Sequence, residues 1–459
     1  MNRQPRALYL LNFISMWECF SYYGMRSLLV LFMIHEMSLN DSQAFGLYAL
    51  YITLIELGGM AGGIIADRFL GLKLSIVIGG WTIMLGHLCL IIPSQEAFFL
   101  GLGTIIAGTS LFRSNVAALL GEFYQDNDPR REAGYTIYYS GINIGGFLAS
   151  LSCAYAAEIY GWHAGFSLAA FGMLLGNICL LWKWNMLAEI KSPDLIKQKT
   201  LIGILGLTLA GPFFAFALYY KEFTALFVPL LALGGICFAI RQTATCTPKQ
   251  KSGFNFLAVL IMFLIIFYVC EEQLGSSLVL FAERHVDRKT LFGIIPAASL
   301  ITFNPSTILI AGPLLARFIN GPIKGLNKIM IGFSLLGSAF YTLYAGCMLA
   351  DSNEVIPLVY AAASIIMIAL GELFIAPTVF SYASQAAPRH LQGITMGMVT
   401  MGFALANLFS GFLSQKMVGS EEGSSMNVYS EIFGIIGFAV LCIAAFLLIL
   451  NFRKKAVAI

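Results

Sequence analysis

The chain is a succession of fourteen long apolar stretches. They run approximately 8–34, 45–66, 74–93, 97–120, 134–158, 163–187, 201–219, 224–240, 254–282, 291–315, 327–349, 356–380, 391–416 and 427–451. An α-helix needs about 20 predominantly apolar residues to cross a bilayer. Only 11% of the residues are charged, whereas soluble domains carry about 25%. The pattern therefore predicts an all-α integral membrane protein with fourteen transmembrane helices.

The basic residues divide unequally between the connections. With the N-terminus inside, twenty of the 27 Lys and Arg residues lie in cytoplasmic segments and five in outer segments, while Arg26 and Arg113 lie inside spans. Cytoplasmic loops carry an excess of such residues. We therefore expect a multi-pass plasma membrane protein, in a bacterium an inner membrane protein, with both termini cytoplasmic. The net charge of +3 comes from these loops and does not indicate nucleic-acid binding.

Two similar motifs indicate that the chain is built from related halves. GGIIADRFLG at 62–71 and AGPLLARFING at 311–321 place Gly, Ala, Arg and Phe in the same order at a cytoplasmic helix end. Parallel repeats of this kind are typical of major facilitator transporters. The pattern predicts a six-helix bundle over 1–190, an inserted two-helix hairpin with cytoplasmic linkers over 191–252, and a second six-helix bundle over 253–459.

The first of these motifs also carries structural residues. Asp67 and Arg68 lie at a cytoplasmic helix end, and we expect them to cap it and to latch helices together in a gating or structural role. Small residues let membrane helices approach closely. We therefore expect close helix packing at the four glycines just before the motif's charges, Gly58, Gly59, Gly62 and Gly63.

The first span carries charged side chains at membrane depth. A charge at the helix centre costs roughly 2.5–3.5 kcal/mol on insertion scales, so intramembrane charges usually line a water-filled pathway. A structural ion pair that closes a helix contact is the alternative. At 100° per residue, one face of this helix collects Asn12, Ser15, Glu18, Cys19, Tyr22 and Arg26.

Later spans contain further ionisable residues, and acids outnumber bases among them. Burial disfavours a charged carboxylate, so the surplus acids must be protonated or hydrated. A carboxylate that changes protonation beside an arginine can couple proton movement to anion binding. Basic groups in the first half and acidic groups in the second would suit a zwitterion. The intramembrane charges are Glu18, Arg26, Glu56, Arg113, Glu271, Glu272 and Glu372.

Nothing in the sequence points to an enzyme or a cofactor. The nine cysteines are scattered without a CxxC pair, which indicates neither a disulfide framework nor a metal site. We recognise no nucleophile–base pair and no phosphate-binding loop. His87, alone in the third span, is interpreted as a packed neutral side chain rather than a proton relay.

The chain resembles the proton-coupled oligopeptide transporters, a branch of the major facilitator superfamily. The resemblance covers nearly all of the chain except 190–252, and the inserted hairpin is similar to that of fourteen-helix bacterial members. The motifs that carry it are WECFSYYGMR at 17–26, GGIIADRFLG, GTSLFRSNVAALLGEFY at 108–124, DPRREAGYTIYYSGINIG at 128–145, YGWHAGFSLAAFGMLLG at 160–176, EEQLGSSLVLFAER at 271–284, GELFIAP at 371–377 and APRHLQGITMGM at 387–398.

The resemblance implies proton-driven import of di- and tripeptides or similar zwitterions by alternating access. It implies an ion pair between Arg26 and Glu272 that breaks when the acid is protonated. Arg113 would bind the substrate carboxylate, and Glu372 would receive the substrate's amino terminus. We further expect a monomer in the bilayer. The remaining substrate-binding side chains implied by the resemblance are Tyr22, Asn143 and Asn304.

The first span departs from the family motif Glu-x-x-Glu-Arg. Ser15 and Cys19 stand at the positions of the first Glu and of the Arg, so one acid and one cation of the proton-coupling site are absent. Glu18 therefore lacks its adjacent cation. Glu56 stands in the second span where many relatives carry a binding-site aromatic. We expect Glu56 to compensate, either as a relocated proton carrier or as a substrate contact.

Two other functions stay open at this stage. The first is uptake of a non-peptide solute, such as an amino-acid conjugate, a metabolite or a chelator, with or without protons. The second is a substrate sensor that binds without net transport.

Overall fold

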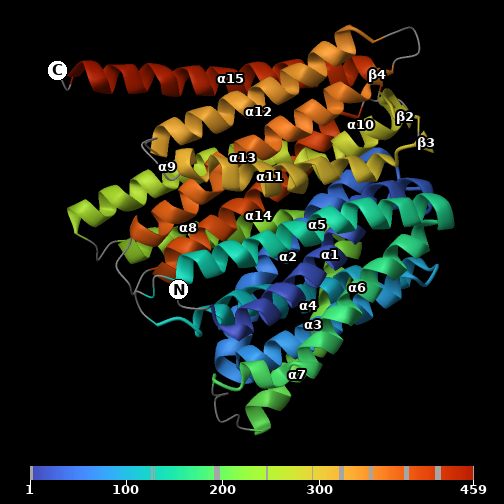
Figure 1. Cartoon of the computed structure of the whole chain (residues 1–459), viewed down its shortest axis with the longest axis vertical. Coiled ribbons are helices and arrows are strands. Elements are labelled where there is room, and N and C mark those ends of the chain that lie inside the picture. The colour runs from blue at the N-terminus through green and yellow to red at the C-terminus, as the bar shows by residue number, and fades with distance from the viewer. Residues whose placement is uncertain are drawn as a thin grey trace. The chain divides into compact units, whose positions relative to one another are not determined.

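The computed structural model describes residues 4–125, 128, 130–190, 197–243, 247–291, 293–319, 325–350, 355–386, 392–418 and 425–457 (Figure 1). Most of these residues are helical. The long helices of the first half are α1 (Arg6–His35), α2 (Asp41–Ile65), α3 (Leu72–Leu90), α4 (Gln95–Gly121), α5 (Arg131–Tyr160), α6 (Trp162–Trp182), α7 (Lys197–Tyr219) and α8 (Lys221–Thr243).

The second half is built in the same way. Its helices are α9 (Pro248–Glu271), the short α10 (Ser277–His285), α11 (Phe303–Ile319), α12 (Gly325–Met348), α13 (Leu358–Ala386), α14 (Gln392–Lys416) and α15 (Met426–Val457). A π-helix, η1 (Ala66–Leu70), ends α2, and 3₁₀ turns occur at η2 (Trp184–Leu187), η3 (Glu272–Gly275) and η4 (Ala297–Thr302). Two short ladders pair β1 (Val286–Asp287) with β4 (Ile356–Pro357) and β2 (Lys289–Thr290) with β3 (Gly293–Ile294).

The predicted all-α membrane architecture is confirmed. Each of the fourteen apolar stretches contains all or most of a long helix, and twelve helices among the described residues are long and apolar enough to cross a bilayer. The two long helices outside this set are α1 and α8. The polar face of α1 lowers its mean hydropathy. Membrane crossing by these two helices, and hence the count of fourteen spans, stays a prediction.

The chain divides into two compact units. Unit 1 comprises Met1–Ser38 and Leu50–Ala225, and unit 2 comprises Leu39–Ala49 and Leu226–Ile459. The first turns of α2 therefore belong to unit 2. The division also falls inside α8 rather than at residues 190 and 252. The two bundles and the inserted hairpin, with the boundaries drawn from the sequence, stay predictions.

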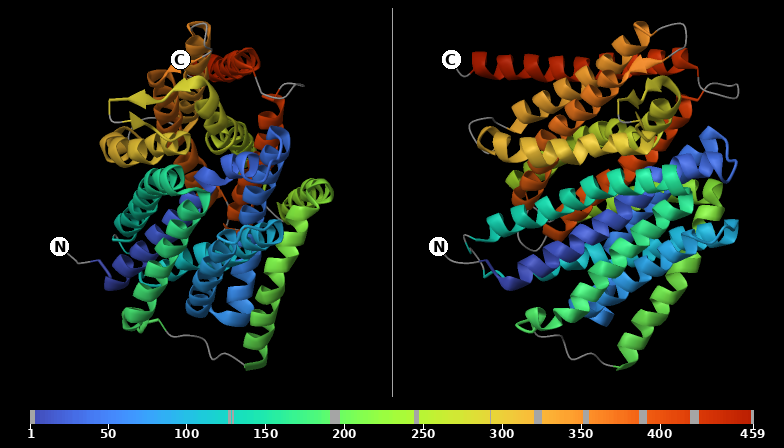
Figure 2. Two further views of the ribbon diagram at one scale, coloured as in Figure 1. Left: turned by 90° about the vertical axis from the view of Figure 1, so that its right-hand side faces the viewer. Right: turned by 45° about the vertical axis from the view of Figure 1, so that its right-hand side comes forward.

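Unit 1 is organised around α1 and α4. Helix α1 lies against α5 and α6, and α3 lies against α4 and α6. Helix α7, one half of the predicted peripheral hairpin, packs on α4 (Figure 2). A Cβ added at Gly103 of α4 would overlap the backbone of α7 at Gly211 and Ala215. His87 of α3 is fully buried, 2.5 Å from the hydroxyl of Ser21, so its predicted packing is confirmed.

Unit 2 packs its helices in a similar way. Helix α12 lies along α13 and α15, and α9 lies along α13 and α14. The first turn of α2 is tied to this unit by an ion pair, in which the Arg284 guanidinium donates to both oxygens of Asp41 at 2.6 and 2.9 Å. The Gln415 amide also donates to the carbonyl oxygen of Ser42 at 3.1 Å.

Glycines set the contact between α2 and α4. A Cβ added at Gly62 would overlap the backbone carbonyl of Ser110, and one added at Gly58 would overlap the Ser110 hydroxyl. A Cβ at Gly59 or Gly63 would meet no described atom within 4 Å. The prediction of close packing is therefore confirmed for Gly58 and Gly62, which share one helix face because they are four residues apart, and stays a prediction for the other two.

We expect Gly62→Val to lower the melting temperature of the detergent-purified protein. A backbone carbonyl cannot move aside as a flexible side chain can, and overpacking a tight contact costs about 1–3 kcal/mol. Thermal unfolding of Gly63→Val, where an added Cβ meets no described atom within 4 Å, is the matched control. Equal melting temperatures for the two variants would contradict this packing.

Candidate functional site

The charged side chains of α1 and α4 form an ion pair inside unit 1. An Arg113 guanidinium nitrogen donates to a carboxylate oxygen of Glu18 at 2.9 Å. Glu18 is only 2% exposed, whereas the side chain of Arg113 is 35% exposed. The carboxylate of Glu18 is therefore buried among the helices, whereas the side chain of Arg113 is partly exposed.

Aromatic rings complete this cluster. The guanidinium of Arg113 lies over the ring of Tyr22, 4.5 Å from its centroid. The guanidinium of Arg26 lies 5.9 Å from the ring centroids of Tyr22 and Tyr23. An arginine over an aromatic face gains roughly 0.5–2 kcal/mol, more as water is excluded. Tyr22 thus brings both intramembrane arginines of unit 1 to one place.

The two residues that depart from the family motif also belong to this cluster. The Cys19 thiol donates to the second carboxylate oxygen of Glu18 at 3.4 Å. The Ser15 hydroxyl donates to the phenolic oxygen of Tyr138 on α5 at 3.1 Å. Neutral hydrogen-bonding groups therefore stand where the family places an acid and a cation.

The ion pair adds to what the sequence shows. Glu18 has no cation beside it on α1, and Arg113 of α4 supplies one from another helix. The motif has lost one acid and one cation, and its remaining acid, Glu18, is paired with the guanidinium of Arg113. The predicted role of Arg113 toward a substrate carboxylate stays a prediction, and the structure gives this side chain a partner within the protein.

In unit 2, Glu372 of α13 gathers two neutral donors. The Asn304 amide on α11 donates to one carboxylate oxygen at 3.4 Å, and the Tyr268 hydroxyl on α9 donates to the other at 3.4 Å. Two residues predicted to bind substrate, Asn304 and Glu372, are thus in contact. Our sequence reasoning did not identify Tyr268. Its spacing of four residues from Glu272, on one helix face, is the signal that would have singled it out.

Other predicted residues lie in both units. Asn143 of α5 is buried, and its amide donates to the Tyr139 carbonyl of its own helix at 3.0 Å. Glu56 of α2 is half-buried in unit 1. Arg26 lies in unit 1 and Glu272 in unit 2, so the ion pair expected between them stays a prediction.

Asp67 and Arg68 lie in the π-helix η1 that ends α2, before Gly71 at φ 72°. Both side chains are exposed. Their latching role stays a prediction. The second copy of the repeat, 311–321, extends beyond the described residues at its last two positions.

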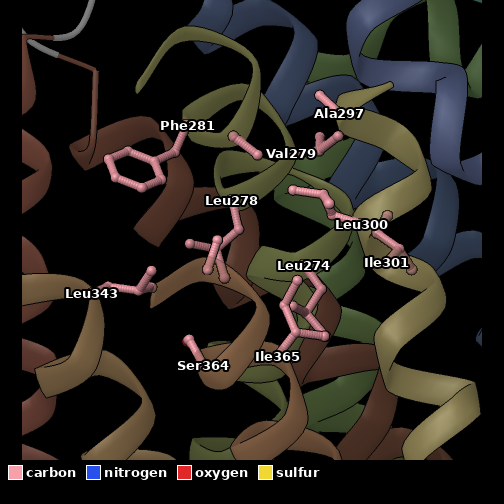
Figure 3. A pocket seen from close by; sticks show the side chains of 12 residues that line it. Leu274, Leu278, Val279, Phe281, Ala297, Leu300, Ile301, Leu343, Ser364 and Ile365 are labelled. Atoms are coloured by element: carbon pink, nitrogen blue, oxygen red, sulfur yellow. The ribbon is translucent and has the colours of Figure 1, made fainter. Parts of the chain in front are cut away.

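A small apolar pocket lies in unit 2 (Figure 3). It is lined by Leu274, Leu278, Val279, Phe281, Ala282, Ala297, Leu300, Ile301, Leu343, Ala361, Ser364 and Ile365. Its one hydroxyl, on Ser364, cannot orient a zwitterion. Within the described part of the chain there is also no group of three or more metal-ligating side chains.

Known proteins resemble this chain along nearly its whole length. The model of the POT family matches residues 73–432. Dipeptide and tripeptide permease A of Proteus mirabilis is 28% identical over 462 residues, which cover 97% of this chain and 94% of that protein. A crystal structure of peptide transporter POT in complex with sulfate is 27% identical, with a TM-score of 0.84 over 98% of this chain and 95% of that one. A crystal structure of tetrameric PepTSo2 is 22% identical, with a TM-score of 0.86 over 98% of both chains.

Proposed function

Because the chain belongs to the POT family, we propose that it imports di- and tripeptides or peptide-like zwitterions by proton symport through alternating access. The family consists of transporters and not of enzymes. A relative named as a dipeptide and tripeptide permease supports this substrate class. The protein would act as a monomer in the plasma membrane, in a bacterium the inner membrane, with both termini cytoplasmic. The bias of Lys and Arg between the connections supports this orientation.

The ion pair between Glu18 and Arg113 carries this proposal. Ionisable side chains inside transmembrane bundles mark substrate and proton pathways. This pair lies on helices rich in apolar residues, and aromatic rings surround it. A proton on Glu18 would release the guanidinium of Arg113 to bind an anion, and loss of that proton would bring the guanidinium back.

The two ends of a peptide would find groups of opposite charge. The substrate carboxylate would bind near Arg26 and Arg113, and Tyr22 would hold these guanidinium groups in place. The substrate's amino group would bind Glu372 beside Asn304. Glu372 accepts from two neutral donors at the long distance of 3.4 Å, and an ammonium group makes shorter, stronger hydrogen bonds to a carboxylate.

Uptake of labelled dialanine into proteoliposomes tests the proposal. If one proton enters with each peptide, an inward proton gradient of one pH unit supports about tenfold accumulation of the peptide inside the liposomes. Accumulation that depends on the gradient is expected. Equal uptake with and without the gradient would identify a facilitator. Absence of uptake would favour a non-peptide solute, and peptide binding without uptake would identify a sensor.

Glu56→Gln is expected to reduce gradient-driven dialanine uptake about tenfold, the size of one charge-assisted hydrogen bond. Peptide counterflow at symmetrical pH, measured in the same liposomes, distinguishes a proton carrier from a substrate contact. A lost proton carrier spares counterflow, whereas a lost substrate contact reduces both. Glu36→Gln, at the exposed end of α1, is the control. Unchanged transport by Glu56→Gln would exclude both roles.

A further inference from the structure

The helix that carries Glu272 is interrupted at that residue. Helix α9 ends at Glu271, the 3₁₀ turn η3 follows, and α10 begins at Ser277. Ser276, between them, has φ −127° and ψ −97°, far from helical values. A stretch of 3₁₀ helix inside a longer helix often marks a functional hinge. The chain thus changes direction directly after Glu272, the acid to which the family resemblance assigns proton coupling.

The amide of Gln273 fills this break. Its nitrogen donates to the carbonyl oxygens of Val269 at 2.9 Å and of Ser410 at 3.1 Å. Its oxygen accepts from the hydroxyls of Ser277 at 2.6 Å and of Ser414 at 2.8 Å. A carboxamide offers two N–H donors and two acceptor sites. All four are used, and the side chain is fully buried.

Serine hydroxyls extend the network to both sides of the break. The hydroxyls of Ser276 and Ser414 lie 2.9 Å apart. The Ser276 hydroxyl also donates to the backbone carbonyl of Glu272 at 3.1 Å. All of these groups are buried and lie within unit 2. The network therefore joins α9, η3 and α10 to α14 and includes the backbone of Glu272 itself.

We propose that Gln273 is a positioning residue for Glu272, holding the break against α14 so that the neighbouring carboxyl keeps one orientation. This inference rests on the proposed function, proton symport, and takes Glu272 as the acid that carries the proton, which is the role that the family resemblance implies. Any slip of η3 along α14 would leave a buried amide with unmade hydrogen bonds, which is costly. The break therefore has one strongly preferred arrangement, and an apolar side chain of similar size would not enforce it.

Gln273→Leu removes all four hydrogen bonds and keeps most of the buried volume. We expect peptide counterflow at symmetrical pH to stay within about twofold of the unchanged protein. Gradient-driven accumulation should fall about tenfold, the size of one lost buried hydrogen bond, and the pH of half-maximal uptake should move. Ser410→Ala is the control, since its carbonyl stays while its buried hydroxyl has no partner among the described residues.

Three outcomes would overturn the inference. Unchanged accumulation and pH profile in Gln273→Leu, while Glu272→Gln abolishes accumulation, would refute it and leave the proposed function standing. Equal losses of counterflow and accumulation would show a role in folding alone. Absence of gradient-driven accumulation in the unchanged protein would refute both proposals together.

Gln273→Leu could fail to give a monodisperse protein on size-exclusion chromatography. In that case the double variant Ser277→Ala/Ser414→Ala is measured with the same readouts. It removes both donors to the amide oxygen, together with the contacts of the Ser414 hydroxyl to Ser276 and to the Ser410 carbonyl, and retains the Gln273 side chain. Failure of this double variant to fold would likewise count against a positioning role.

Discussion

Glu272→Gln is expected to abolish proton-driven accumulation of dialanine and to spare peptide counterflow. Glutamine has nearly the same shape as glutamate but can neither carry the transported proton nor bear a negative charge. Glu272 is 8% exposed within a helix long and apolar enough to cross the membrane. With a one-unit inward pH gradient, the accumulation ratio should therefore fall from about ten to one.

Two assays on the same proteoliposomes check this result. Gradient-driven uptake reports the proton step, and counterflow at symmetrical pH reports peptide exchange without it. Glu271→Gln is the matched control, because adjacent helical residues point about 100° apart. Full gradient-driven accumulation by Glu272→Gln would place the proton on another acid.

The second large effect is expected at the ion pair of α1 and α4. Arg113→Gln leaves the carboxylate of Glu18 almost fully buried without its cation, and removal of one partner of a buried pair costs about 3–5 kcal/mol. Glu18→Gln leaves a guanidinium whose side chain is 35% exposed, so water can replace the lost partner and the cost should be smaller. Thermal unfolding in detergent measures both losses.

The double variant Glu18→Gln/Arg113→Gln should recover much of the stability lost in Arg113→Gln, since it leaves no unpaired charge. Residues in direct contact show coupling energies of about 0.5–3 kcal/mol in such cycles. Arg113→Lys keeps the positive charge but loses the planar guanidinium with its paired donors. Its stability should lie between those of Arg113→Gln and the unchanged protein. If the stability lost in the double variant equals the sum of the losses in the two single variants, the ion pair contributes nothing to stability.

The hydropathy of the sequence was sufficient to predict an all-α membrane protein and the positions of its long helices. Each apolar stretch became a helix, because a chain in lipid must satisfy its backbone hydrogen bonds within the segment. The 3.6-residue period also placed Ser15, Glu18, Cys19 and Tyr22 on one face of α1. The prediction succeeded because helix geometry sets the direction of each Cβ, whatever the neighbouring helices are.

The glycines show where such reasoning stops. All four glycines near the end of α2 look alike in the sequence, yet Gly58 and Gly62 meet Ser110 of α4 while Gly59 and Gly63 meet no described atom. The sequence shows which face of α2 each glycine lies on. It does not show which helix packs on that face, or which residues of that helix lie level with the glycine. For the same reason, loop composition could not show that α7 packs on α4.

The sequence by itself determined the class of protein, the helices and the set of charged residues within them. Only the tertiary structure decided which of these charges and amides meet. Glu18 and Arg113 are 95 residues apart, and Asn304 and Glu372 are 68 residues apart. Helical periodicity orients a side chain within its own helix, whereas its partner depends on which helix packs there and at what height, and that is a property of the packed bundle alone.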